Sequence, residues 1–201
     1  MIKTLQNHHF FTIFLFIILS SSGCMQQPLP IYYYTLNSTA GAERAEANPL
    51  PPVFLGPIQL TSFLDQGQII TRNSSNSINI EEQLRWAGDL KQMISDAMLS
   101  NIEHRLGTHS VYEFTGTDNP SGLQIIINFL HFEKDSDGKA HVMARWRILS
   151  GKDGTILYSS TSSHKTVPDS DSTEALTIAL SQGLDLLAGD FSDAIISLSS
   201  Q

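Results

Sequence analysis

His164 could form part of a catalytic trio, because Asp169 and Asp171 follow it closely and serines surround it. A histidine held by a carboxylate can take the proton of a serine hydroxyl and make it a nucleophile. Serines and threonines are so frequent in this half of the chain that such a trio arises by chance, and no G-x-S-x-G turn singles out one serine. The chain also lacks a glycine-rich phosphate loop and an H-E-x-x-H motif. We therefore predict that the protein is not an enzyme, with a periplasmic hydrolase acting through His164 as an alternative.

Two further histidines, His131 and His141, lie on neighbouring predicted strands, where some registers would place them side by side. Zinc binds three or four ligands, and neither a cysteine nor a third histidine accompanies this pair. Residues 135–138 read Asp-Ser-Asp-Gly, like the start of a calcium loop, but the later oxygen ligands and the closing glutamate are missing. We expect strand-surface histidines and a hairpin turn, with no metal and no cofactor.

Cys24 is the single cysteine of the chain and follows an apolar leader. Residues 1–9 carry one lysine and no acidic residue, residues 10–19 read FFTIFLFIIL, and small residues precede the cysteine, as in a secretory signal peptide. A helix of ten residues is about 15 Å long, half of the roughly 30 Å hydrocarbon core of a bilayer. The leader is therefore expected to direct export rather than to span the membrane.

The run Ser21-Ser22-Gly23-Cys24 resembles the lipobox of bacterial lipoproteins, in which the cysteine thiol receives a diacylglycerol and becomes the new N-terminus. This resemblance implies that Cys24 is the lipidation site, labelled by palmitate, with plain secretion and a free thiol as the alternative. Met25 stands where an aspartate would favour retention at the inner membrane in that family. The implied location is the periplasmic face of the outer membrane, reached through the lipid anchor.

The chain has 201 residues and a formal net charge of −8 at pH 7. A protein this acidic is repelled by phosphate backbones, which argues against electrostatically driven binding to nucleic acid. The part that follows the leader is long enough for one domain with one hydrophobic core. We expect a lipoprotein signal peptide at 1–23, a lipidated tether at 24–30 and a single domain at 31–201.

Strands are expected at 31–36, 53–60, 68–71 and 77–80, and three more at 122–133, 139–149 and 155–165. The last three are separated by turns that contain Asp-Gly, a pair that favours tight hairpins. The middle one, 139–149, alternates between apolar and polar side chains, so one face should be buried while the other meets solvent or a partner. These three strands should form an antiparallel meander.

Two helices are expected at 86–106 and 172–198, where apolar residues recur at spacings of three and four. In the first, Asn101 and Arg105 fall on the polar face, and in the second, Ile178 falls on the apolar face. The order of strands and helices predicts an α+β fold. We expect a largely antiparallel mixed sheet with a C-terminal strand meander, and two long amphipathic helices that cover one face.

Three stretches carry a family resemblance: VFLGPIQLTSFLDQGQIITR at 53–72, RWAGDL at 85–90 and HVMARWRI at 141–148. With the Tyr-Tyr-Thr-Leu run at 33–36 and Trp86, expected to open the first helix, they resemble the PqiC/YmbA-type ABC-transport auxiliary lipoproteins. That family has a leucine-aspartate pair followed by a Gln-Ile-Val-Thr-Arg segment, matched here by Leu64-Asp65 and by residues 68–72. The resemblance extends over nearly all of the chain beyond the leader.

The resemblance implies a non-enzymatic outer-membrane lipoprotein subunit of an MCE-type (mammalian cell entry) intermembrane lipid transport system, which supports envelope integrity. Its partners would be the periplasmic MCE-domain protein and the inner-membrane component of the transporter. A second copy of the chain is another possible partner, at the wet face of strand 139–149 or at the edge near Pro57. The alternative is a lipoprotein that assembles or supports another outer-membrane machine.

The segment from Phe63 to Arg72 has two interpretations. In a partner-binding segment, Asp65 and Arg72 would make polar contacts, and Phe63 with Leu64 would form an apolar anchor. In a packed connection between two strands, Leu64 would be buried and Arg72 would bind a carboxylate or backbone carbonyls. These four residues are the candidate partner-binding residues, and we favour the packing interpretation, because motifs without catalytic residues usually encode packing.

Overall fold

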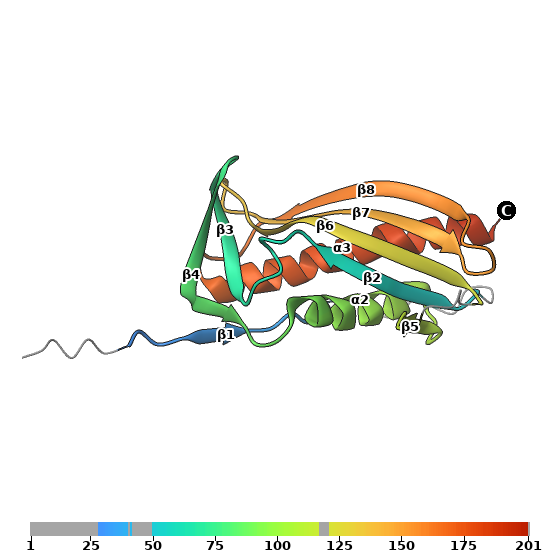
Figure 1. Ribbon diagram of the computed structural model, residues 1–201, viewed down its shortest axis with the longest axis horizontal. Helices are drawn as coiled ribbons and strands as arrows, with labels where there is room; N and C mark the ends of the chain where they lie inside the picture. Colours follow the sequence, from blue (N-terminus) through green and yellow to red (C-terminus); the bar gives the residue numbers. More distant parts are fainter. Residues whose placement is uncertain (1–27, 40, 42–49, 117–120, 201) are drawn as a thin grey trace, which may run out of the picture. The chain divides into compact units, whose positions relative to one another are not determined.

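The sheet is built around β6 (Leu123–Lys134), which pairs with β7 (Ala140–Ser150) along one edge and with two shorter strands along the other. The computed structural model describes residues 28–39, 41, 50–116 and 121–200. Ile31–Gln201 forms one compact unit, whose described strands make an eight-stranded mixed sheet with two helices on one side (Figure 1). The α+β class is confirmed.

The strands β6, β7 and β8 (Ile156–Thr166) form the expected antiparallel meander. Gly138 and Gly154 take positive φ angles of 81° and 72° in the two connecting turns. Within the described ranges no residue other than glycine has a positive φ, so each Asp-Gly pair contributes one left-handed residue rather than two. Along β7 the even-numbered residues from Ala140 to Ile148 are buried and their odd-numbered neighbours are not, which confirms the predicted alternation.

The other edge of β6 supplies the parallel part of the mixed sheet, whose longest pairings, β6 with β7 and β7 with β8, are antiparallel as expected. There β2 (Val53–Leu60) runs parallel to the first half of β6, and β3 (Gln68–Ser74) joins it in parallel near its end. Two short strands are also parallel to their neighbours, β1 (Tyr32–Tyr34) to β4 and β5 (Val111–Glu113) to β2. Between β2 and β6 the chain passes through a hairpin and a helix, and this long connection brings it back in the same direction.

The fourth strand and the start of the first helix also differ from expectation. The strand β4 (Ser77–Trp86) is ten residues long, so Trp86 closes a strand and does not open a helix. The helix α2 (Leu90–Leu106) begins after Asp89, whose carboxylate caps it by accepting a hydrogen bond from the N–H of Gln92 at 2.9 Å. Much of β4 remains partly exposed, which explains why charged residues interrupt its apolar pattern.

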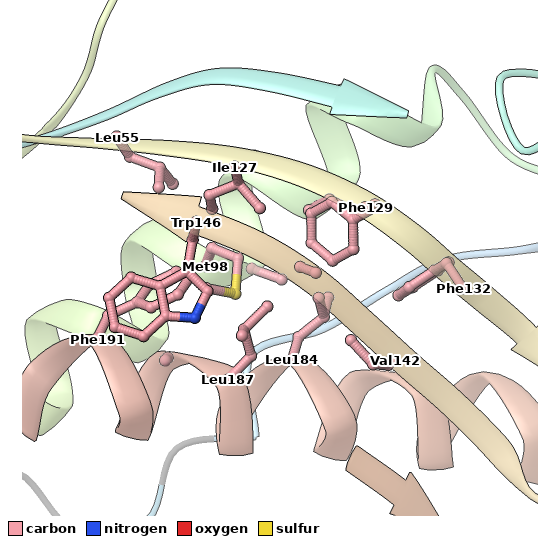
Figure 2. Packing of buried hydrophobic residues seen from close by; sticks show 14 of the residues in the cluster. Leu55, Met98, Ile127, Phe129, Phe132, Val142, Trp146, Leu184, Leu187 and Phe191 are labelled. Carbon is pink, nitrogen blue, oxygen red and sulfur yellow. The ribbon is translucent and has the colours of Figure 1, made fainter. Parts of the chain in front are cut away.

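The helices α2 and α3 (Thr173–Ser199) lie on the same side of the sheet (Figure 1), as expected. They cover different strands, because α3 packs mainly on β7 and β8 whereas α2 packs on β2 and β5. Figure 2 shows Trp146 of β7 and Phe191 of α3 in this core, with ring centroids 4.6 Å apart. Neither of the described helices is long and apolar enough to cross a membrane.

Close approach of α3 to the sheet requires a glycine. A Cβ atom at Gly183 would lie 2.6 Å from Cγ2 of Val142 in β7, closer than real side-chain contacts allow. The helix is continuous through this position, so Gly183 lowers the intrinsic stability of the helix but allows it to pack closely on the sheet. Gly189 plays a similar part between the helices, since a Cβ there would lie 2.9 Å from Nη1 of Arg105.

The interface between α2 and α3 contains polar residues that the sequence placed on the outer face of the first helix. Asn101 is buried and Arg105 forms an ion pair with Asp185 of α3. Asn101 and Arg105 are spaced three or four positions from apolar residues of α2, so they lie beside its apolar face and can meet the second helix instead of solvent. Ile178, expected on the apolar face of α3, is 50% exposed, because that side of the helix lies outside the sheet contact.

The chain that follows β1 fastens onto both helices. The backbone N–H of Asn37 donates to Oγ of Ser181 on α3 at 3.2 Å. Oγ of Ser38 and the N–H of Thr39 donate to Oδ1 of Asn101 on α2, at 2.7 and 3.2 Å. Residues 37–39 are therefore attached to the helix layer directly after β1 has joined the sheet.

Candidate functional site

The segment between β2 and β3 holds the candidate partner-binding residues. Its first turn is closed by hydrogen bonds from the N–H groups of Leu64 and Asp65 to the carbonyl of Thr61, at 2.8 and 3.2 Å. The Leu64 side chain is 1% exposed and belongs to the hydrophobic core. Leu64 therefore holds the segment to the body of the fold and offers no apolar surface to a partner.

Arg72 lies on β3 and binds Glu133 of β6. Its Nε donates to Oε1 of Glu133 at 2.9 Å, and its Nη1 donates to the carbonyl of Ser75 at 3.1 Å. The guanidinium carbon lies 5.8 Å from the centre of the Phe63 ring, within the range of a cation–π contact. The geometry of the packing interpretation, with Leu64 buried and Arg72 on a carboxylate, is thus present in the structure.

Glu133 is a buried carboxylate with several partners. Its side chain is 0% exposed, and besides Arg72 it accepts a hydrogen bond from the N–H of Phe132 at 3.0 Å. Nδ1 of His131 lies 2.7 Å from Oε1 of the same carboxylate. A buried charge is tolerated when it is paired and hydrogen-bonded in this way.

Asp65 is the exposed polar member of the segment. Its carboxylate accepts a hydrogen bond from Nζ of Lys91 on α2 at 2.6 Å. This hydrogen bond raises the pKa of Lys91 above its ordinary value. About 40% of each side chain remains in contact with solvent, at 42% for Asp65 and 41% for Lys91. Of the candidate residues, Asp65 and the half-buried Phe63 therefore reach the surface of the segment, beside the exposed Gln66 and Gly67.

The paired histidines lie side by side, as some registers allowed. The rings of His131 and His141 stack with centroids 4.6 Å apart and an angle of 19° between their planes. Burial, and to a smaller extent the nearby charges of His131 and Lys165, holds the pKa of His141 below its ordinary value. Over the described ranges, no group of three or more histidine, cysteine, aspartate or glutamate residues is placed to hold a metal ion.

The carboxylate that contacts His164 is not one of the two suggested for a catalytic trio. Nε2 of His164 lies 2.8 Å from Oδ2 of Asp190 on α3, so neither Asp169 nor Asp171 is its partner. In the described part of the chain, no serine is hydrogen-bonded to this histidine. The pair joins β8 to α3 and has the form of a contact between sheet and helix.

The Asp-Ser-Asp-Gly run at 135–138 forms a hairpin turn that is held by the side chain of Asp135. Its Oδ1 accepts hydrogen bonds from the N–H groups of Asp137 and Lys139 at 2.9 Å each, and its Oδ2 accepts one from Nζ of Lys165 at 2.7 Å. Burial raises the pKa of Asp135, but the hydrogen bonds from Lys165 and the two N–H groups outweigh it and leave the pKa below its ordinary value. The carboxylate organises a hairpin turn, as the sequence predicted.

The candidate lipidation site, Cys24, lies outside the described residues, and so does the expected signal peptide at 1–23. Of the expected tether, residues 28–30 are described and form no helix or strand.

Comparison with known proteins places the chain in a family. Residues 34–191 match the family model of the ABC-type transport auxiliary lipoprotein component. The chain belongs to this family. The PqiC/YmbA-type resemblance found in the sequence is thereby confirmed, and the match extends from β1 to the second half of α3. No curated protein matches the chain.

Two solved structures share the fold of this auxiliary lipoprotein. Protein XCC0632 from Xanthomonas campestris superposes with a TM-score of 0.71 at 17% sequence identity, covering 85% of this chain and 97% of that one. A structure described as that of an uncharacterized protein superposes with a TM-score of 0.67 at 14% identity, covering 83% of this chain and 99% of the other. At these identities the likeness concerns the fold alone.

One surface feature of the auxiliary lipoprotein was not predicted from the sequence. A groove of about 550 Å³ lies on the sheet, and its lining includes Arg145 and Arg147 of β7. The alternation predicted for strand 139–149 puts its polar residues, Arg145 and Arg147 among them, on the face turned away from the core. The missing information was the identity of their neighbours on β2, β6 and β8, which depends on strand register.

Proposed function

We propose that this auxiliary lipoprotein is a non-enzymatic outer-membrane subunit of an MCE-type intermembrane lipid transport system, which docks the periplasmic MCE component and supports envelope integrity. The observation that carries the proposal is the match of residues 34–191 to the family model of ABC-type transport auxiliary lipoproteins. Lipidation of Cys24 would hold the domain at the periplasmic face of the membrane. The inner-membrane transporter component is the second partner in this arrangement.

Within this proposal, Phe63 and Asp65 form the docking contact, while Leu64 and Arg72 hold the segment in place. Phe63 and Asp65 reach the surface, whereas Leu64 is in the core and Arg72 is bound to Glu133. Aromatic side chains are enriched in protein interfaces, where a few residues carry most of the binding energy. The ion pair to Lys91 fixes the orientation of the Asp65 carboxylate before a partner arrives.

Co-purification of the full-length chain from membranes tests the function. We expect the MCE-domain protein and the ABC components to be recovered together with it in mild detergent. Recovery of a different outer-membrane machine, without any MCE-domain protein, would reject the proposal and favour an assembly or structural role there.

Site-specific photocrosslinking tests the docking segment separately. We expect Phe63→p-benzoylphenylalanine to crosslink to the MCE-domain protein in cells. The matched control is Tyr112→p-benzoylphenylalanine, at an aromatic residue that is 49% exposed on β5. A crosslink from position 112 and none from position 63 would move the docking contact away from the segment while leaving the proposed function intact.

A further inference from the structure

The strand β7 presents two arginines, Arg145 and Arg147, on the face of the sheet that carries no helix. Both side chains are exposed, and Trp146 between them points the other way, into the core against Phe191 of α3. Residues two apart on a strand lie on the same face, about 6.6 Å apart along the chain. The two guanidinium groups therefore reach solvent on the same side, at neighbouring positions.

Strand register places donor groups beside these arginines. Arg145 is paired with Asn128 of β6 and with Thr161 of β8, and Asn128 is paired in turn with Gln59 of β2. The result is one polar row that crosses four strands. Arg147 is paired with Ser159 of β8, which gives a second, shorter row beside the first. Directly paired residues lie about 4.5–5.5 Å apart, close enough to contact one ligand.

These rows line the groove of about 550 Å³. The polar residues of its lining are Gln59, Asn128, Arg145, Arg147, Ser159, Ser160 and Thr161, and no carboxylate is among the lining residues. Guanidinium, amide and hydroxyl groups can all donate hydrogen bonds. The groove is therefore a shallow concave surface that is rich in donors and locally positive.

Neither guanidinium has an anionic partner in the described part of the chain. Two other cations, by contrast, are bound to carboxylates, since Arg72 binds Glu133 and Lys165 binds Asp135. No ion pair or hydrogen bond of the Arg145 or Arg147 side chain is formed with any described residue. In a protein with a net charge of −8, two adjacent arginines without a carboxylate leave a specific local attraction for an anion.

The chemistry of the lining favours phosphate over carboxylate. A carboxylate has two acceptor oxygens and can be satisfied by a single arginine fork, whereas a phosphate group offers more oxygens to two forks and to neighbouring hydroxyl and amide donors. Ile126 and Trp146 are the apolar residues of the lining, and polar groups form the larger part of its surface, so the groove suits a polar headgroup better than an acyl chain. The fitting ligand is thus a phosphate group at the end of a larger molecule or alone.

We propose that the groove around Arg145 and Arg147 binds a phosphate group, either of a free phosphate ester or of a phospholipid headgroup. The two guanidinium groups hold the phosphate oxygens, and Asn128, Ser159 and Thr161 supply further hydrogen bonds. This proposal is based on the register of the strands and on the lining of the groove, and it is independent of which transport partner the protein has. The net negative charge of the chain repels extended polyanions, while this groove accepts a single small anion.

Isothermal titration of the full chain in uncharged detergent tests the site at low, constant ionic strength, because salt weakens exposed charge interactions. The probes are inorganic phosphate, sn-glycerol 3-phosphate and dihexanoyl phosphatidylglycerol, with acetate as the carboxylate comparison. We expect the phosphate probes to bind, and Arg145→Gln/Arg147→Gln to weaken binding by about tenfold or more, because charge-assisted hydrogen bonds are lost. Equal affinity for glycerol phosphate and the lipid indicates a free ester, and tighter lipid binding indicates a headgroup.

The matched control is Arg85→Gln/Lys152→Gln, which changes the net charge equally at two residues that do not line the groove. It should bind phosphate like the natural chain, and thermal unfolding should show all variants to be folded. Equal phosphate binding by both double variants, acetate binding as tight as phosphate binding, or no phosphate binding by the natural chain would overturn the proposal. So would an oligomer that dissociates in Arg145→Gln/Arg147→Gln while phosphate fails to bind, because the arginines would then contact a second copy.

Discussion

The guanidinium group of Arg105 on α2 donates to both carboxylate oxygens of Asp185 on α3, from Nε and from Nη2, at 2.8 Å each. The hydrogen bond to Asp185 raises the pKa of Arg105 above its ordinary value. Such a two-pronged contact fixes the distance and rotation of one helix against the other. Gly189 leaves the space through which the arginine passes.

The two glycines of α3 should respond differently to alanine. Gly183→Ala places a Cβ 2.6 Å from Cγ2 of Val142 in the core, and we expect it to lower the free energy of unfolding by about 1–3 kcal/mol. Gly189→Ala meets the flexible end of Arg105, and the gain in helix propensity, up to about 1 kcal/mol, offsets the adjustment. Chemical denaturation measures both, and Gly183→Ala/Val142→Ala should recover part of the loss. Equal losses for the two single variants would contradict this account.

Two ion pairs of the Phe63–Arg72 segment should differ in their contribution to stability. Arg72→Met leaves the buried Glu133 carboxylate without its main cation, and we expect a loss of about 2–4 kcal/mol. Lys91→Met breaks an exposed pair and should cost less than about 1 kcal/mol. Urea denaturation compares them, and Glu133→Gln should rescue part of the Arg72→Met defect. A small effect of Arg72→Met would mean that Glu133 is satisfied by its remaining partners.

Stability should decrease as the pH falls below about 6.5, because of His141. The pKa of His141 in the folded state lies below its ordinary value of 6.5, so the unfolded chain takes up a proton first as the pH falls. The free energy of unfolding then decreases from about pH 6.5 down to the folded pKa and is level below it. The groups that face His141 are His131 and Glu133 on β6, Ser163 and Lys165 on β8, and Asp135 in the turn.

Replacement of His141 isolates this effect. Chemical denaturation of His141→Gln at several pH values should show a shallower slope over this range than the natural chain. The control His104→Gln removes an exposed histidine of α2 and should keep the natural slope. Asp135 contributes at lower pH. Its pKa in the folded state lies below the ordinary value of 3.8, so it stabilises the fold above about pH 3.8, and this stabilisation is lost as the pH falls through the folded-state pKa. An unchanged slope in His141→Gln would assign the acid sensitivity to another group.

Cys24→Ser should release the protein from the membrane. Without the thiol no diacylglycerol can be attached, and the remaining contacts of the domain should not keep it in the membrane fraction. Fractionation of cells is the measurement, and labelled palmitate should enter the natural chain but not the variant. Incorporation of label into Cys24→Ser would exclude Cys24 as the acyl site.

The sequence predicted best what depends on local periodicity. Alternation along β7 identified the buried side that holds Trp146, and the two Asp-Gly turns predicted the meander. Spacing failed at Trp86, because the charged residues of the partly exposed strand β4 masked its pattern and a helix was extended into it. A cap at Asp89 was the local signal that could have separated the two elements.

Contacts between distant strands were beyond the sequence. The partner of Arg72 lies 61 residues away on β6, and the two meet because β3 joins β6 at Thr71 and Lys134. The groove around Arg145 likewise requires the pairing of four strands, two of which, β2 and β6, are parallel. The guanidinium group of Arg72 indicated a carboxylate as its partner, but which carboxylate lies within reach depends on the topology of the sheet.

The attachment of residues 37–39 to both helices has a mechanical consequence. Any tension on the chain ahead of Ile31 enters the fold at β1, which is hydrogen-bonded to β4, and then reaches Ser181 of α3 and Asn101 of α2. The force is shared between the sheet and the helix pair, so an edge strand cannot simply peel away. Pulling at the N-terminal end therefore loads both layers of the domain and not only the short strand β1.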